Sequence, residues 1–246
     1  MADDEQEKIK LLFLGPVKCG KSTLASFLSG TRDTATSKYY PTEPLRILET
    51  ELELDATKLK LNEDNQNNKH KRLVFAGGDA RKRKVIVQLW DVSGNVKHQQ
   101  GWPAIADHAD GIIYVFNHSQ TRANVNANSQ KELSLWYKHF ALNQNEVDEN
   151  GNFEKRVLER HSLIFAHQSA PADLDDDEDE RPPLPTMPKE LEKVKVIKTS
   201  LDYESDNFKE VFDHLVERIV LDKMEEEEDA LIKLERERNA GKATIL

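Results

Sequence analysis

Apolar and polar residues are arranged along this chain in blocks that predict short strands separated by helices. Residues 8–14 are expected to form a buried strand, and the continuous apolar run at residues 111–116 is typical of a strand that is covered on both faces of a sheet. Residues 45–54 (LRILETELEL) alternate apolar and polar positions, which predicts a strand with one buried face. Further strands are expected in the apolar segments 85–90, 162–166 and 194–197.

Helices are expected between these strands. Residues 21–29 continue directly from a glycine-containing loop, and residues 129–142 and 208–219 carry apolar side chains at helical spacing. We interpret the stripe in the middle helix as core. Its members are Leu133, Trp136, Tyr137 and Phe140. From Asp222 the chain is highly charged, and helix is expected to about Glu237.

The alternation of strands and helices predicts an α/β fold with a central, mostly parallel, six-stranded sheet that is flanked by helices. We expect one domain over residues 8–221, between a flexible N-terminus (1–7) and a charged C-terminal tail (222–246). Polar and acidic composition predicts two insertions, an extended hairpin near 55–84 and an acidic loop near 168–190.

Composition narrows the classes of partner. The 246 residues include 35 Lys+Arg and 45 Asp+Glu, for a formal net charge of −10. This balance argues against general nucleic-acid binding, and we interpret the basic run Arg81-Lys82-Arg83-Lys84 as a solvated hairpin turn. The single cysteine, Cys19, fits a reducing compartment. We expect no direct membrane anchor, because there is no long apolar stretch and no C-terminal cysteine for prenylation.

Residues 15–22, GPVKCGKS, match the pattern G-x-x-x-x-G-K-S of a phosphate-binding loop. The loop follows a predicted strand and opens a predicted helix, which is the context that this pattern requires. Gly15 and Gly20 let backbone N–H groups turn inward around phosphate oxygens. Lys21 supplies a positive charge, and Ser22 supplies a hydroxyl for Mg²⁺. The alternative is a glycine turn with a purely structural role.

Two later segments add candidate ligands. Asp91 ends a predicted strand, where its carboxylate is placed to hold a water of the Mg²⁺ shell. Gly94 follows in the pattern D-x-x-G and is placed to offer its N–H to a γ-phosphate. Thr42 lies in a polar loop, and its hydroxyl is expected to close on Mg²⁺ only when a γ-phosphate is present. The predicted metal ligands are therefore Ser22, Thr42 and Asp91.

These elements, in this order, resemble the Ras-superfamily small GTPases of the Rab-like branch. The closer resemblance, over roughly residues 8–221, is to the Rab-like subunit of the intraflagellar transport B complex. The segments that carry it are GPVKCGKSTLASFL, YYPTEPLRILE, WDVSGN, WPAIADHADGIIYVFN and LIFAHQS. The resemblance implies a small-GTPase fold that binds GTP or GDP with Mg²⁺. The loop residues that it implies for binding are Gly15, Val17, Lys18, Cys19, Gly20, Lys21, Ser22 and Thr23.

The same resemblance implies a biological setting. The partners would be coiled-coil subunits of the B complex, bound through the two switch regions. The location would be the cilium or flagellum and the cytoplasm, with a role in cilium or flagellum assembly.

The chain departs from the family pattern where the base is recognised. The family reads N/T-K-x-D after the fifth strand, whereas this chain reads HQSA at residues 167–170, without the carboxylate that accepts guanine N–H bonds. Selectivity for guanine over adenine therefore stays open. The candidate substitutes for base contact are His167, Gln168, Ser200 and Leu201.

A second departure concerns hydrolysis. Asn95 stands at the position of the water-positioning glutamine and is one methylene shorter. Val17 stands where the fastest hydrolysers carry glycine, so its side chain crowds the γ-phosphate. We expect a slow GTPase at most. We identify no arginine finger, and we interpret Arg32 and Arg46 as surface residues.

Our hypothesis is an atypical GTP/GDP-binding transport subunit with slow or absent hydrolysis. The alternatives are an active membrane-trafficking GTPase and a nucleotide-independent scaffold with a relict loop. Trp102 is either a core residue or an anchor for a partner. The charged tail is either a solvated helix or a coiled-coil contact.

Overall fold

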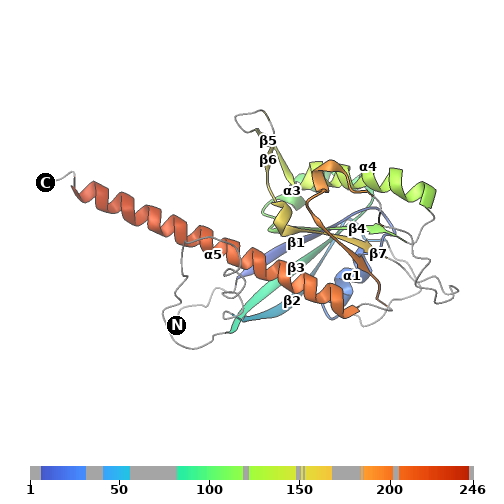
Figure 1. Cartoon of the computed structure of the whole chain (residues 1–246), viewed down its shortest axis with the longest axis horizontal. Helices are drawn as coiled ribbons and strands as arrows, with labels where there is room; N and C mark the ends of the chain where they lie inside the picture. The colour runs from blue at the N-terminus through green and yellow to red at the C-terminus, as the bar shows by residue number, and fades with distance from the viewer. Residues whose placement is uncertain are drawn as a thin grey trace.

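A six-stranded sheet in the order β2-β3-β1-β4-β7-β8 forms the centre of the molecule (Figure 1). The computed structural model describes residues 7–31, 41–55, 82–118, 122–147, 151, 153–167, 184, 186–201 and 205–243. The strands are β1 (Lys8–Leu14), β2 (Leu45–Asp55), β3 (Lys82–Val92), β4 (Gly111–Asn117), β7 (Ser162–His167) and β8 (Lys195–Thr199). β2 pairs with β3 antiparallel, and the other neighbouring strands are parallel. The predicted α/β fold with a mostly parallel sheet is confirmed.

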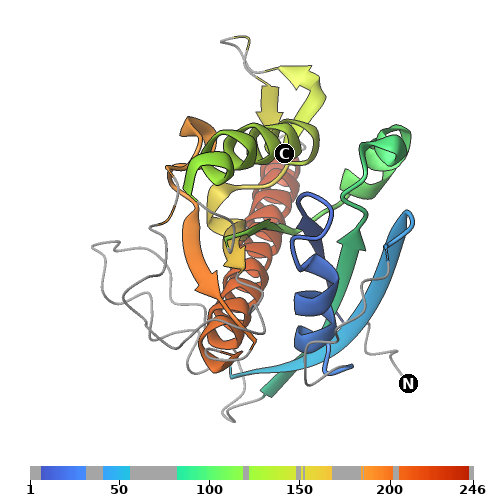
Figure 2. The ribbon, with the colours of Figure 1, turned by 90° about the vertical axis from the view of Figure 1, so that its right-hand side faces the viewer.

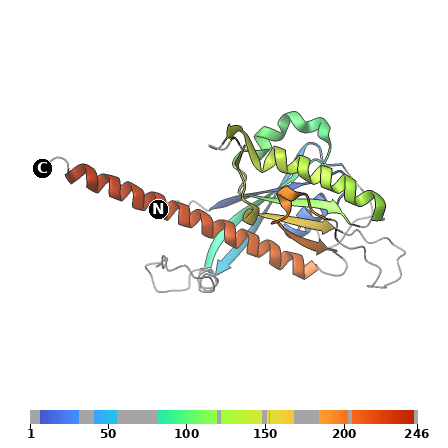
Figure 3. The same cartoon turned by 45° about the horizontal axis from the view of Figure 1, so that its top comes forward.

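Helices cover both faces of the sheet (Figures 2 and 3). The helices are α1 (Lys21–Leu28), α3 (Trp102–Ala106), α4 (Arg122–Phe140) and α5 (Ser205–Ala243), with short 3₁₀ helices η1 (Val96–Gly101), η2 (Glu159–His161) and η4 (Lys189–Leu191). One apolar cluster joins α1 and α5 to the sheet, and a second cluster joins α3 and α4 to the opposite face. The molecule is therefore a three-layer sandwich.

The apolar residues from Leu11 to Leu14 in β1 follow from this layering. Ile9, Leu11 and Phe13 enter the cluster under α1 and α5, whereas Leu12 and Leu14 enter the cluster under α3 and α4. Because strand side chains alternate between faces, the part of a strand that is covered on both faces needs apolar residues at successive positions. β1 therefore holds its carboxyl end, where the phosphate loop begins, in a rigid position.

The second cluster also decides the role of Trp102. Its side chain is 1% exposed, and its ring centroid lies 4.7 Å from that of Trp136 on α4. The predicted core stripe of α4 is buried with it. Trp102 is a core residue in this structure rather than an exposed anchor.

Two segments differ from the expectations. Lys82, Arg83 and Lys84 lie in β3, so the predicted hairpin turn is wrong for these three residues. The charges of Arg83 and Lys84 are tolerated because Arg83 pairs with Glu7 at 2.8 Å and Lys84 pairs with Glu51 at 2.7 Å. A second hairpin, β5 (Leu142–Val147) with β6 (Phe153–Lys155), was not predicted, because its sequence is mostly polar.

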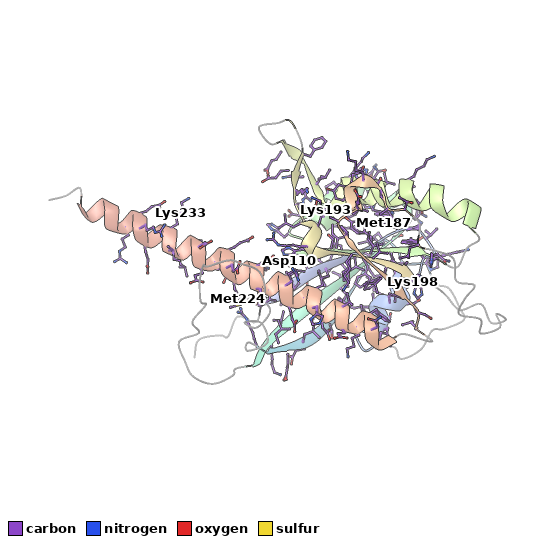
Figure 4. All side chains as sticks on the ribbon, viewed as in Figure 1. Asp110, Met187, Lys193, Lys198, Met224 and Lys233 are labelled. Carbon is purple, nitrogen blue, oxygen red and sulfur yellow. The ribbon has the colours of Figure 1, made fainter. Side chains whose placement is uncertain are left out.

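The last helix is longer than expected. α5 continues without interruption through Asp222 and ends at Ala243 rather than near Glu237. Met224 still packs against the core cluster, whereas Lys233 lies on the part that projects from the body (Figure 4). Among the described residues, no helix combines the length and apolar composition that crossing a membrane requires.

Candidate nucleotide-binding site

The glycines of the phosphate loop are held where side chains do not fit. Gly15 has φ 147°, and a Cβ there would lie 2.0 Å from the carbonyl oxygen of Val115 on β4. Gly20 has φ 94°, and a Cβ there would lie 2.2 Å from the ring of His167. The loop therefore packs directly on the carboxyl ends of β4 and β7, and only glycine permits this approach.

The side chain of Lys21 forms hydrogen bonds with the backbone of the phosphate loop. This side chain is buried, and its Nζ donates to the carbonyl oxygens of Gly15 at 2.9 Å and Pro16 at 2.8 Å. Cys19 Sγ lies 3.7 Å from the same ammonium group. Burial raises the pKa of the Cys19 thiol above its ordinary value of 9.0, so the thiol is neutral and packs in the core. The ammonium thus places a positive charge beside the loop backbone.

The predicted metal ligands converge from three elements. Ser22 Oγ, in the first turn of α1, lies 2.9 Å from Thr42 Oγ1, in the segment before β2. The Thr42 hydroxyl also donates to Asp91 Oδ2, near the end of β3, at 3.2 Å. We expected Thr42 to close only on a γ-phosphate and its metal ion. In this structure the Thr42 hydroxyl is held by hydrogen bonds to Ser22 and Asp91.

The Asp91 carboxylate fits a cation site. Its side chain is 0% exposed, and its Oδ1 has no hydrogen-bond partner among the described residues. Burial raises the pKa of Asp91 above 3.8, whereas a hydrogen bond from Ser22 and the charges of Lys21 and Arg46 lower it. A buried acceptor without a partner is costly, and a metal-bound water would satisfy it. No described group of three or more His, Cys, Asp and Glu side chains is arranged to hold a metal ion by itself.

Gly94 packs against the phosphate loop. A Cβ at Gly94 would lie 2.4 Å from both Pro16 C and Val17 N. Val17 itself is 49% exposed beside this contact. The D-x-x-G segment and the loop segment predicted to face a γ-phosphate are thus in direct contact.

The Asn95 side chain is bonded to the backbone of the segment that follows it. Its Oδ1 accepts a hydrogen bond from the backbone N–H of Lys97 at 3.1 Å, so it caps η1. The side chain is therefore engaged at the start of the second switch region.

The remaining loop residues surround the same site. Lys18 is exposed and has φ 62°, which is rare for a residue with a side chain. Thr23 lies in the first turn of α1, where its N–H donates to Gly20 O at 3.1 Å.

The candidate base contacts lie at the ends of β7 and β8. His167 is buried, and its Nδ1 lies 3.2 Å from Thr199 Oγ1. Ser200 is buried next to Thr199, and Leu201 packs on the core cluster under α5. Gln168 lies outside the described residues. The link between His167 and Thr199 was not predicted, since no local pattern relates residues so far apart in sequence.

Arg46 was interpreted as a surface residue, and its side chain is 43% exposed, but it also makes contacts at the site. Its guanidinium bonds to α1 and lies beside Asp91. The signal that would have found it is strand pairing, because Arg46 stands opposite Asp91 in the β2–β3 ladder.

The chain is similar to known proteins of intraflagellar transport. The chain is 48% identical over 237 residues to intraflagellar transport protein 22 of Trypanosoma brucei brucei, covering 96% of each chain. Among solved structures, it is similar to the GTP-bound crystal structure of T. brucei IFT22/74/81, with a TM-score of 0.58, 43% identity and coverage of 89% of this chain and 98% of that chain. GDP-bound T. brucei IFT22 matches with a TM-score of 0.54, 39% identity and coverage of 89% and 99%. No protein-family model matches the sequence.

Proposed function

The chain belongs to the family of intraflagellar transport protein 22, and from this premise we propose that it is a GTP- and GDP-binding subunit of the intraflagellar transport B complex. It assembles with the counterparts of the 74 and 81 proteins that accompany its relative in the GTP-bound crystal structure. The two switch regions provide the surface for these coiled-coil partners. Its place of action is the cilium or flagellum, together with the cytoplasm from which such complexes assemble.

One observation carries the proposal, namely the convergence of Ser22, Thr42 and Asp91. Three polar side chains from three distant segments meet within 3.2 Å at the carboxyl edge of the sheet. Such convergence is unnecessary for a glycine turn with a structural role only. When bound there, Mg²⁺ would neutralise phosphate charge. Ser22, Thr42 and Asp91 would hold the ion, directly or through its waters.

The phosphates bind to the loop between β1 and α1. The backbone N–H groups from Val17 to Ser22 face them, and the N-terminus of α1, which includes Thr23, adds its partial positive charge. Lys21 supplies a full charge from inside the loop. The N–H of Gly94 faces the γ-phosphate.

The base is guanine. The solved relatives carry GTP or GDP, although this chain lacks the carboxylate of the usual guanine motif. The base therefore contacts the segment around His167 and Gln168 and the loop at Ser200 and Leu201. This arrangement gives a weaker preference over adenine, because fewer guanine donors are satisfied.

Hydrolysis is slow or absent. Asn95 is short, and its side-chain oxygen is engaged in capping η1. Val17 adds bulk beside the loop segment that faces the γ-phosphate. These two features favour a subunit that keeps its nucleotide over an enzyme that turns it over.

Titration with fluorescent GTP, GDP and ATP analogues tests this function. We expect saturable binding of both guanine nucleotides, weaker binding of ATP, and loss of about tenfold to a hundredfold in affinity for Lys21→Met, because a charge-assisted contact is removed. Lys84→Met, which removes an exposed cation of β3, is the matched control. Equal affinity of the wild type and Lys21→Met would overturn the site. Reconstitution with the two coiled-coil partners tests the assembly, and a chain that fails to bind them overturns that part.

A further inference from the structure

Arg46 lies next to Asp91, one of the predicted metal ligands. It lies on β2 directly opposite Asp91 in the antiparallel ladder with β3. Side chains at opposed positions of a ladder lie on the same face, so both point toward α1. The Arg46 side chain is 43% exposed, whereas that of Asp91 is fully buried.

The guanidinium makes a specific set of contacts. Its Nη2 donates to the carbonyl oxygen of Ser22 at 2.9 Å and to Ser26 Oγ at 2.7 Å. Its Nε lies 3.5 Å from Asp91 Oδ2. These bonds fix the cation beside the same carboxylate oxygen that accepts from Thr42. Asp91 Oδ1 is left without a hydrogen-bond partner among the described residues.

We propose that Arg46 supplies part of the positive charge that the bound phosphates require, so that nucleotide binding by this chain depends only weakly on Mg²⁺. This inference rests on the proposed function. Its physical basis is a fixed cation that shares the Asp91 carboxylate with the metal ion. A like charge beside the metal position weakens metal binding, and the same charge attracts phosphate when the metal is absent.

The contacts to Ser22 and Ser26 make this role different from that of a mobile arginine. Arg46 is fastened to α1 by two hydrogen bonds, so its charge stays in place. A lysine at this position would keep the charge, whereas a glutamine would keep one hydrogen-bond donor and lose the charge. The two substitutions therefore separate electrostatics from local structure.

The test measures the dissociation constants of fluorescent GDP and GTP analogues with excess Mg²⁺ and with EDTA. For the wild type, we expect chelation to raise the dissociation constant by less than about tenfold. We define the chelation ratio as the dissociation constant in EDTA divided by the dissociation constant in excess Mg²⁺. For Arg46→Gln, we expect this ratio to be about fivefold higher than for the wild type, which is the size of effect expected from one partly exposed charge interaction. Arg46→Lys should keep the wild-type ratio within about twofold, and so should the control Lys84→Gln on the same strand pair.

Each outcome decides a different claim. If the wild type binds neither nucleotide with Mg²⁺, the proposed function fails and this inference fails with it. If the wild type binds and Arg46→Gln has an unchanged or smaller ratio, only the inference is overturned. A general loss of fold stability raises both dissociation constants together and leaves the ratio unchanged. If Arg46→Gln does not fold, the wild-type ratio still decides, since a rise of more than about tenfold on chelation overturns the inference.

Discussion

The ring of His167 lies against the backbone of Gly20, where a Cβ would come within 2.2 Å of His167 Cδ2. His167 ends β7, and Gly20 is the last residue before α1. The Nδ1 atom of His167 also lies 3.2 Å from Thr199 Oγ1 at the end of β8. One side chain thus supports the phosphate loop from the sheet and links it to the loop proposed to contact the base.

Substitution of Gly20 by alanine should destabilise the fold by about 2–4 kcal/mol, which combines overpacking against His167 with the cost of a positive φ. In a Gly20→Ala/His167→Ala double variant, the overpacking part should be relieved and the backbone part should remain. Urea unfolding of the two single variants, the double variant and the wild type gives the coupling free energy. Gly30→Ala is the control, because Gly30 has φ 66° and nothing lies within 4 Å of its Cβ position. A coupling below about 0.5 kcal/mol would show that the two residues do not interact.

Gly94→Ala should weaken GTP binding more than GDP binding. The new methyl group would meet Pro16 C and Val17 N at 2.4 Å, so the segment must move away from the loop that we propose faces the γ-phosphate. We expect a loss of about tenfold for GTP and less than about threefold for GDP, as for one hydrogen bond to a charged group. Isothermal titration measures both constants. Gly101→Ala, with nothing within 4 Å of its Cβ position, should leave both unchanged. Equal losses for the two nucleotides would contradict the placement of Gly94.

Asn95→Gln should accelerate GTP hydrolysis. The longer side chain reaches a water that asparagine does not, and the rate should rise toward the ~10⁻⁴–10⁻³ per second typical of intrinsic hydrolysis by small GTPases with glutamine. Single-turnover measurement with radiolabelled GTP provides the rate. Loss of the cap on η1 should cost about 1 kcal/mol of stability. A wild type already as fast as its Asn95→Gln variant would contradict the account of slow hydrolysis.

Asp213→Asn should raise stability at neutral pH without changing nucleotide affinity. Burial raises the pKa of the Asp213 carboxyl above 3.8, and its Oδ1 has no hydrogen-bond partner among the described residues. A raised pKa means that the contribution of Asp213 to folding is present below pH 3.8 and is lost as the pH rises through the folded-state value. The charged form therefore costs stability at pH 7, and asparagine removes this cost.

Thermal unfolding at pH 7 and near pH 4 measures this effect. The melting temperature of Asp213→Asn should exceed that of the wild type at pH 7, and the difference should shrink as the pH falls. Glu210→Gln, at an exposed position of the same helix, is the control. A difference that stays constant across this pH range would show that titration of Asp213 is not its cause.

The sequence predicted the parts of the site that are continuous in the chain. The segment from Gly15 to Ser22 is recognisable because one short stretch contains the glycines, the lysine and the hydroxyl, between an apolar strand and a helix. Asp91 and Gly94 are recognisable for the same reason. The strands were recognisable from their apolar runs and, for β2, from the alternation of apolar and polar residues. Their order in the sheet was not predicted.

The contacts between residues that are far apart in the sequence could not be predicted from local sequence patterns. Arg46 meets Asp91 through the register of β2 with β3, and His167 meets Thr199 through the pairing of β7 with β8. The basic residues at the start of β3 were misassigned because their partners, Glu7 and Glu51, lie far away in sequence. Pairing register is set by the whole sheet, so such contacts need the fold.

The central claim is that this chain holds a guanine nucleotide in the loop that Lys21 fastens. Its most direct test is to denature purified wild-type protein and Lys21→Met, then to identify and count the released nucleotides by chromatography and mass spectrometry. Both proteins are first incubated with a mixture of GTP, GDP and ATP and then desalted. The wild type should release guanine nucleotide in substantial excess over adenine nucleotide, and Lys21→Met should release little of either. Release of no nucleotide by the wild type, or equal release by both proteins, would contradict the account.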